Sequence, residues 1–233
     1  MSSVKDNIAR VQDRIAAACH RAGRKPEEVR LIAVTKTVDA GKVREAYEAG
    51  LRDFGENRVQ EAAAKRPALA DLDANWHLIG HLQSNKAKAA AELFGWIHSV
   101  DSIRLAERIN HAAQSRGTPL PILLQVNLAQ EETKSGVNES EMKGTIENLL
   151  SFKGLDLRGL MLIPPMSENP EVSRPWFQRL RRLTEEIRLS GFPRTPLTEL
   201  SMGMSHDFEV AIEEGATMVR VGTAIFGERQ AAT

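Results

Sequence analysis

The feature that most constrains this sequence is a regular alternation of short apolar runs with longer segments of helical periodicity. Apolar runs of about four to eight residues are typical of strands buried on both faces, while apolar residues spaced three and four apart are typical of amphipathic helices. After the first run, Asp39 can cap a helix that Gly50 can end. Eight strands are expected, at residues 31–34, 53–57, 76–80, 96–100, 122–126, 157–163, 197–202 and 218–221.

Each expected strand is followed by a helical or helix-like segment, which predicts parallel strands joined by right-handed crossovers. Eight such units in a chain of 233 residues match a (β/α)8 TIM barrel, which typically takes about 250 residues as one domain. Residues 1–23 precede the first unit and carry apolar residues at helical spacing. The sequence therefore predicts an α/β fold: a single (β/α)8 barrel domain, residues 1–233, with an extra N-terminal helix packed on the barrel.

Charge balance and cysteine count exclude several classes of protein. The 31 Lys and Arg residues equal the 31 Asp and Glu residues, whereas nucleic-acid-binding domains are usually basic. Cys19 is the single cysteine, so neither an internal disulfide nor a zinc-thiolate site is expected. The chain lacks an apolar stretch of about 18 residues and a signal-peptide core at its start. We expect a soluble, cytoplasmic protein that binds neither nucleic acid nor membrane.

Active sites in TIM barrels lie at the C-terminal ends of the strands, which directs attention to the residues that follow each run. Lys36 follows the first strand, where partial desolvation could lower its pKa and leave the neutral amine that attacks an aldehyde. A solvated lysine leaving a strand is the simpler interpretation. Asn57 ends the second strand, beside Lys36, and can either offer a hydrogen bond to a ligand or cap the next helix.

The seventh expected strand ends just before a helix, in a segment that contains Ser201 and Gly203. A hydroxyl, a glycine that permits close backbone approach and a helix N-terminus can together bind an anion. The alternative is a capped loop in which Ser205 or Asp207 satisfies backbone amides.

In the eighth strand, the period of two directs Arg220 toward the barrel interior, opposite to Val219 and Val221. Gly222 and Thr223 then offer backbone amides and a hydroxyl at the position where TIM barrels often bind phosphate. The alternative for Arg220 is a structural ion pair with an acidic residue of the neighbouring strand, such as Glu199.

Two further sets of residues could react. His77 and His81 are four residues apart, but they fall on an expected strand and its exit and lack a HExxH glutamate, so no metal site is expected. Lys134 follows the fifth strand and could be a second aldehyde acceptor or a surface lysine.

Five segments in order and at matching spacing resemble the pyridoxal phosphate homeostasis proteins, the YggS/PROSC type. The resemblance extends over nearly the whole chain and implies a fold like the barrel domain of alanine racemase. The segments are Ala33–Lys36, Phe54–Asn57, Trp76–Lys86, Ser201–Asp207 and Val219–Gly227.

The resemblance implies that Lys36 carries pyridoxal 5′-phosphate (PLP) as a covalent internal aldimine and that Arg220 faces the pyridine nitrogen. It also implies a PLP-binding protein that stores the cofactor and supplies it to PLP-dependent apo-enzymes, without established catalytic turnover. Catalytic residues are not implied, and a monomer is expected. The expected cofactor-binding residues are Lys36, Asn57, Ser201, Gly203, Arg220, Gly222 and Thr223, of which Ser201, Gly222 and Thr223 would hold the phosphate.

Two enzymatic alternatives remain. An amino-acid racemase of the related barrel type needs a tyrosine opposite its lysine, supplied by a second domain, whereas the single tyrosine here, Tyr47, falls on the first barrel helix. A sugar-phosphate enzyme could use the Lys36 amine with His77 or His81 as acid or base. A cation such as Arg220 beside the pyridine nitrogen keeps that nitrogen unprotonated and weakens PLP as an electron sink, which favours storage over catalysis.

Overall fold

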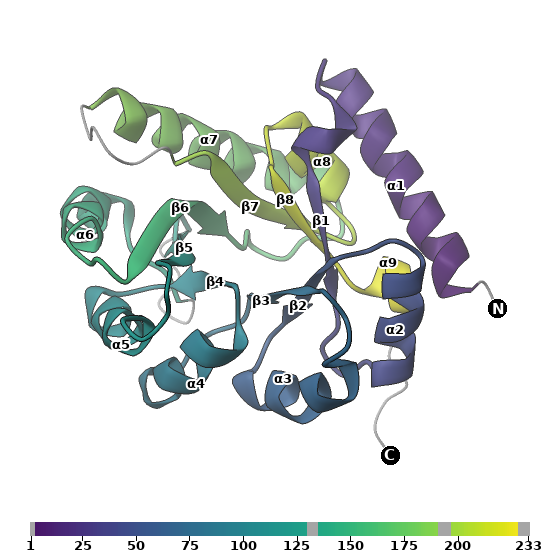
Figure 1. The fold of residues 1–233 in the computed structure, drawn as a ribbon. Coiled ribbons are helices and arrows are strands. Elements are labelled where there is room, and N and C mark those ends of the chain that lie inside the picture. The colour runs from purple at the N-terminus through teal and green to yellow at the C-terminus, as the bar shows by residue number, and fades with distance from the viewer. Residues whose placement is uncertain (1–2, 130–134, 191–196, 228–233) are drawn as a thin grey trace.

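The computed structural model describes residues 3–129, 135–190 and 197–227, and its strands form a closed barrel (Figure 1). Strands adjacent along the chain pair in parallel, and β1 also pairs with β8, which closes the sheet. The (β/α)8 barrel expected from the sequence is confirmed. The strands are β1 Arg30–Val34, β2 Asp53–Glu56, β3 Asn75–Leu78, β4 Trp96–Val100, β5 Leu120–Val126, β6 Leu155–Leu162, β7 Glu199–Met204 and β8 Met218–Val221.

Helices surround the barrel and cover its outer face (Figure 1). The α-helices are α1 Val4–Arg21, α2 Ala40–Glu48, α3 Val59–Lys65, α4 Ala87–Leu93, α5 Ile103–Ala113, α6 Met142–Leu149, α7 Arg174–Leu189, α8 Phe208–Glu213 and α9 Thr223–Phe226. Short 3-10 helices are η1 Pro26–Glu28, η2 Arg66–Leu69, η3 Ser84–Lys86, η4 Glu139–Glu141 and η5 Pro170–Ser173. Within the described residues, none of the helices is long and apolar enough to cross a membrane.

The barrel has two apolar layers because successive strand residues alternate between its faces. The outward residues of the strands pack with the helices into one large buried cluster. The inward residues form a small separate cluster of four side chains, Ile32, Leu123, Met161 and Met218, against which Trp96 packs. Arg220 is two residues beyond Met218 on the same face, so it points inward as the alternation predicts.

The N-terminal helix α1 lies outside the ring of crossover helices, along α8, α9 and α2 (Figure 1). Ser3 and Asp6 form a capping box at its start, and its buried face consists of apolar residues at helical spacing. Asn7 Nδ2 donates to the carbonyl of Ile225 in α9 at 2.7 Å, and Arg21 pairs with Glu213 of α8 at 2.7 Å. The helix therefore joins the two ends of the described chain.

Candidate functional site

Strand register places Lys36 between residues of two neighbouring strands. In the β1–β2 pair Val34 lies opposite Gly55, so Lys36 and Asn57 each follow by two residues. In the β1–β8 pair Ala33 lies opposite Val221, so the segment Gly222–Thr223 borders the other side of Lys36. The sequence-predicted residues of these three strands therefore meet at the C-terminal end of the barrel.

The backbone at Lys36 is held in an unusual conformation. Thr37 has a φ of 62°, in the left-handed region that β-branched residues rarely adopt, and its hydroxyl donates to the Lys36 carbonyl at 2.6 Å. Such a conformation costs on the order of 1–3 kcal/mol and persists only where its surroundings impose it. Lys36 itself is half-buried.

A buried ion pair lies behind the ends of β1 and β2, next to the segment that contains Lys36 and Thr37. Lys65 of α3 pairs with Glu56 and also donates to the Thr35 carbonyl at 2.7 Å, while the Thr35 hydroxyl donates to Glu56 Oε1 at 2.7 Å. Glu56 is fully buried, and burial raises its pKa although the hydrogen bonds from Lys65 and Thr35 oppose this. Since Thr35 precedes Lys36 and Glu56 precedes Asn57, the pair fixes the backbone from which both site residues emerge.

The ends of β7 and β8 form a small polar rim. The Gly222 amide donates to the Ser205 hydroxyl at 3.2 Å, and Ser205 and Gly222 are half-buried while Thr223 is exposed. A Cβ at Gly222 would lie 3.2 Å from Val34 Cβ, so a side chain there would require Val34 to move by a few tenths of an ångström. The sequence predicts Ser205 only as a capping residue. Ser205 lies beside Gly222 because β7 continues to Met204.

Gly203 lies where β7 packs closely against α8. Its φ is +90°, and a Cβ there would lie 2.5 Å from Ala211 Cβ and 2.9 Å from Phe208 Cα, both in α8. Gly203 therefore permits close packing of β7 on α8. Asp207 accepts from the Met204 amide at 2.7 Å and from the Ser173 hydroxyl at 2.9 Å. These bonds fix the turn from Met204 to Asp207.

Arg220 is buried, with 4% of its surface exposed, and its partners in the described structure are neutral oxygens. Its Nη2 donates to the Leu162 carbonyl at 3.0 Å and its Nη1 to Ser201 Oγ at 2.5 Å. The alternative ion pair with Glu199 is not formed, since that carboxylate accepts from Thr217 Oγ1 at 2.7 Å. Burial lowers the pKa of Arg220 to about 10, with a partly opposing effect of the Asp207 charge. Two of the five N–H groups of a guanidinium are thus used.

Ser201 lies beneath this rim, inside the barrel. Its side chain is fully buried, and its hydroxyl oxygen lies 2.9 Å from His98 Nδ1 in addition to accepting from Arg220. Ser201 therefore supports Arg220, whereas the hydroxyl that lies beside Gly222 is that of Ser205. His98 was not singled out in the sequence, although it is a polar residue at an inward position of an apolar strand.

The histidine pair of the sequence separates in space. His77 is buried in the barrel, with Nε2 2.9 Å from Asp53 Oδ1, whereas His81 is largely exposed and lies 3.1 Å from Asp101 Oδ2 and 3.0 Å from Ser135 Oγ. The described residues contain no group of three or more His, Cys, Asp or Glu side chains arranged to hold a metal ion. Lys134 lies outside the described residues.

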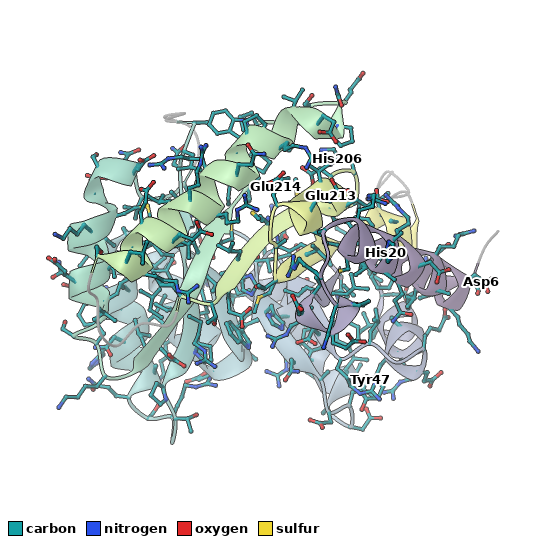
Figure 2. All side chains as sticks on the ribbon, turned by 90° about the horizontal axis from the view of Figure 1, so that it is seen from above. Asp6, His20, Tyr47, His206, Glu213 and Glu214 are labelled. Carbon is teal, nitrogen blue, oxygen red and sulfur yellow. The ribbon has the colours of Figure 1, made fainter. Side chains whose placement is uncertain are left out.

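Tyr47 lies at the opposite end of the barrel from Lys36. Its ring faces the Arg52 guanidinium, 3.9 Å from the ring centroid, and Arg52 directly precedes β2. In Figure 2 Tyr47 is on the side of the molecule away from α7. The single tyrosine therefore cannot act opposite the lysine.

The fold and site define a (β/α)8 barrel protein whose lysine, buried arginine and glycine–hydroxyl rim converge at the C-terminal ends of the strands. The chain belongs to the pyridoxal phosphate homeostasis protein family within the alanine racemase N-terminal domain family, which matches residues 5–230. It is 47% identical to the pyridoxal phosphate homeostasis protein of Pseudomonas aeruginosa, over 98% of this chain and 97% of that protein. It is 43% identical to the protein of that name from Escherichia coli, over 98% of each chain.

Solved structures agree with this assignment. PipY of Synechococcus elongatus, in a structure with PLP bound, is 44% identical and superposes with a TM-score of 0.82, over 93% of this chain and 100% of that one. Alanine racemase of Corynebacterium glutamicum is 17% identical with a TM-score of 0.70, over 97% of this chain and 62% of the racemase. The racemase likeness shows the fold alone, and the family resemblance expected from the sequence motifs is confirmed.

Proposed function

We propose that this chain binds PLP and maintains PLP homeostasis by storing the cofactor and supplying it to other proteins. The observation that carries the proposal is the position of Lys36 between Asn57 and Gly222–Thr223 in the strand register, with the buried cation Arg220 on the neighbouring strand. The names of the relatives and the PLP-bound PipY structure support it.

The donor set fits the three functional groups of PLP. We propose that the Lys36 amine binds the aldehyde covalently as a Schiff base and that Arg220 faces the pyridine nitrogen. Gly222 and Thr223 would hold the phosphate with a backbone amide and a hydroxyl. Ser205 is better placed than the buried Ser201 to add a second hydroxyl, because Ser205 already contacts the Gly222 amide.

The same groups favour storage over turnover. PLP acts as an electron sink when its pyridine nitrogen is protonated, usually by a carboxylate partner. Arg220 keeps its proton and carries a positive charge, so it disfavours a second proton on a nitrogen that faces it. Tyr47, at the other end of the barrel, offers no acid or base opposite Lys36. We propose a carrier or regulator without a reaction of its own.

Borohydride reduction and peptide mapping of the PLP-loaded protein test the assignment. Reduction should fix the PLP mass on the peptide that contains Lys36, and Lys36→Ala should lose that label together with the near-visible absorption of a Schiff base. Lys86→Ala is the matched control, because Lys86 is another lysine after a barrel strand, and it should retain both. A label on a different lysine in the unaltered protein would contradict the Lys36 assignment.

We further propose that the protein is a cytoplasmic monomer whose partners are PLP-dependent apo-enzymes. A PLP scavenger that competes only for the free cofactor distinguishes direct transfer from release. Transfer to an apo-enzyme that the scavenger does not slow supports contact between donor and recipient, and complete inhibition contradicts it. Sedimentation of the loaded protein measures its oligomeric state.

A further inference from the structure

A row of hydrogen-bonded polar side chains crosses the barrel interior from β2 to β8. Asp53 Oδ1 lies 2.9 Å from His77 Nε2, and His77 Nδ1 lies 3.0 Å from His98 Nε2. His98 Nδ1 lies 2.9 Å from Ser201 Oγ, which accepts from Arg220 Nη1 at 2.5 Å. The row thus connects Arg220 with a carboxylate at the start of β2, at the other end of the barrel.

The two ends of the row determine the direction of its hydrogen bonds. At one end the Asp53 carboxylate can only accept, so His77 Nε2 carries a proton and donates. At the other end the guanidinium can only donate, so Ser201 Oγ accepts from it. When both imidazoles are neutral, His98 Nε2 donates to His77 Nδ1, and the Ser201 hydroxyl donates to His98 Nδ1. Every donor then points away from Arg220, and every lone pair points toward it.

Burial and nearby cations favour the neutral form of both imidazoles. His77 and His98 are fully buried. Burial lowers the pKa of His98 well below its usual range, and the charges of Arg220 and Arg30 act in the same direction. Burial also lowers the pKa of His77, against the effect of Asp53.

The charged groups that face the row lie near its ends, and the Asp207 charge acts on Arg220 at one of them. Arg30 Nε lies 3.9 Å from Asp53 Oδ1, and the Arg30 guanidinium lies 5.3 Å from the centroid of the Trp96 ring. The Glu199 carboxylate, on β7, accepts a hydrogen bond from the Thr217 hydroxyl. A protonated imidazole in this row would therefore lie between the cations Arg30 and Arg220, which disfavours it.

We propose that His98 is a positioning residue for Arg220: by accepting the hydroxyl proton of Ser201 it turns the Ser201 lone pairs toward the guanidinium, and His77 and Asp53 fix the direction of that hydrogen bond. Arg220 donates to no carboxylate within the described structure, so the oriented row, together with the Leu162 carbonyl, holds the direction of its guanidinium. The consequence for PLP, an unprotonated pyridine nitrogen, rests on the proposed function.

Packing alone does not explain the row. The same interior layer contains Ile32, Leu123, Met161 and Met218, and apolar branched residues are the usual filling of such barrels. Buried polar groups stabilise a fold only when every member is satisfied, so two imidazoles and a hydroxyl are a demanding choice for an interior. The need to hold the Arg220 guanidinium in one orientation explains why polar side chains occupy these interior positions.

The first test uses the ligand-free protein. The ¹⁵N NMR spectrum of the imidazoles distinguishes the two neutral tautomers from each other and from the cation. We expect His77 and His98 both to carry their proton on Nε2, with Nδ1 unprotonated, near neutral pH. A proton on His98 Nδ1 would reverse the Ser201 hydrogen bond and overturn the proposal, whether or not the protein binds PLP.

The second test compares two variants that each lose one hydrogen bond of the row. In His98→Asn the amide oxygen takes the place of Nδ1 and can still accept from Ser201. In His98→Gln the amide nitrogen takes the place of Nε2 and can still donate to His77, but the acceptor for Ser201 is lost. The readouts are the PLP dissociation constant and the ¹⁵N shift of PLP labelled at its ring nitrogen.

In His98→Gln the Ser201 hydroxyl loses its acceptor and no longer turns its lone pairs toward Arg220, so a hydrogen bond from a charged group is weakened. PLP binding should weaken about tenfold, and the PLP ring nitrogen should become protonated at higher pH than in wild type. His98→Asn should resemble wild type in both readouts. Ser99→Ala, which removes a buried hydroxyl of β4 that donates to the Gly80 carbonyl, is the control and should change neither.

Equal behaviour of the Asn and Gln variants would overturn the proposal, since a merely structural role predicts similar losses from both. If wild type fails to bind PLP, the proposed function fails, and the tautomers of the ligand-free protein alone decide the role of His98.

Discussion

Lys36 and Arg220 are both cations at the C-terminal end of the barrel, and the protein supports them in opposite ways. Around Lys36 the support acts on the backbone: Lys65 binds the carbonyl of the preceding residue, Thr35, from outside the barrel, and Lys36 itself is half-buried. Around Arg220 the support acts on the side chain, because Ser201 and a carbonyl bind the guanidinium itself from inside the barrel.

The difference corresponds to what each group does under the proposed function. A nucleophile that exchanges covalent partners needs a fixed starting point and a side chain free to move. A cation that controls the protonation of its neighbour needs its charged group held in place, since electrostatic effects depend steeply on distance when water is excluded. An ion pair supports the first group, and an oriented row of neutral groups supports the second.

Breaking the ion pair should have the largest effect. Lys65→Met leaves the Glu56 carboxylate buried without its cation, and removal of one partner of a buried pair typically costs about 3–5 kcal/mol of unfolding free energy. Urea unfolding measures the loss, which should diminish at acidic pH as Glu56 takes up a proton. Arg44→Met, which breaks the exposed pair with Asp71, is the control and should change stability little. Equal effects of the two variants would show that the Glu56–Lys65 pair gives no special support.

Protonation of the interior row should have an intermediate effect. Because the pKa values of His77 and His98 are lowered in the folded protein, the unfolded chain binds more protons below about pH 6.5. Stability is then complete above that pH and falls below it, by up to about 1.4 kcal/mol per pH unit for each histidine. Urea unfolding at a series of pH values measures the slope.

His98→Asn should remove one histidine's share of this slope. His111→Asn, on the exposed side of α5, provides the control and should leave the slope as it is in wild type. A His98→Asn protein with an unchanged slope would show that His98 is charged, or absent from the titration, in the folded state.

Removal of a single hydroxyl, Ser205 on the rim or Ser201 in the interior, should have the smallest effect, and this effect is on ligand binding. Ser205→Ala should weaken PLP relative to pyridoxal by about tenfold, because a charge-assisted hydrogen bond to the phosphate is lost. Ser201→Ala should weaken both ligands alike, since Ser201 acts on Arg220. Equilibrium binding of PLP and pyridoxal to the two variants gives the ratio. A phosphate-dependent loss in Ser201→Ala and none in Ser205→Ala would restore Ser201 as the phosphate ligand.

Much of this site follows from local sequence pattern. Apolar runs mark the strands, parallel pairing brings their ends to one edge, and the period of two turns Arg220 inward. The neighbours Lys36, Asn57 and Gly222 were therefore predictable as soon as a barrel was inferred.

The interior row was not predictable in the same way. Ser201 could be taken for a rim residue because the sequence places the end of the strand near residue 202, whereas β7 continues to Met204. The contact between His98 and Ser201 joins residues 103 positions apart, across strands that are not neighbours in the sheet. Strand pattern identifies which residues point inward, but it does not show which of them meet in the interior.

The position of α1 has a consequence for the synthesis of the protein. In chain order the helix precedes its partners α8 and α9, and the strand that closes the barrel on β1, by most of the described residues. At about 5–20 residues per second, the apolar face of α1 waits roughly ten to forty seconds on the ribosome for those partners. Barrel closure and the docking of α1 therefore belong to one step, which must wait until β8 and α9 have been made.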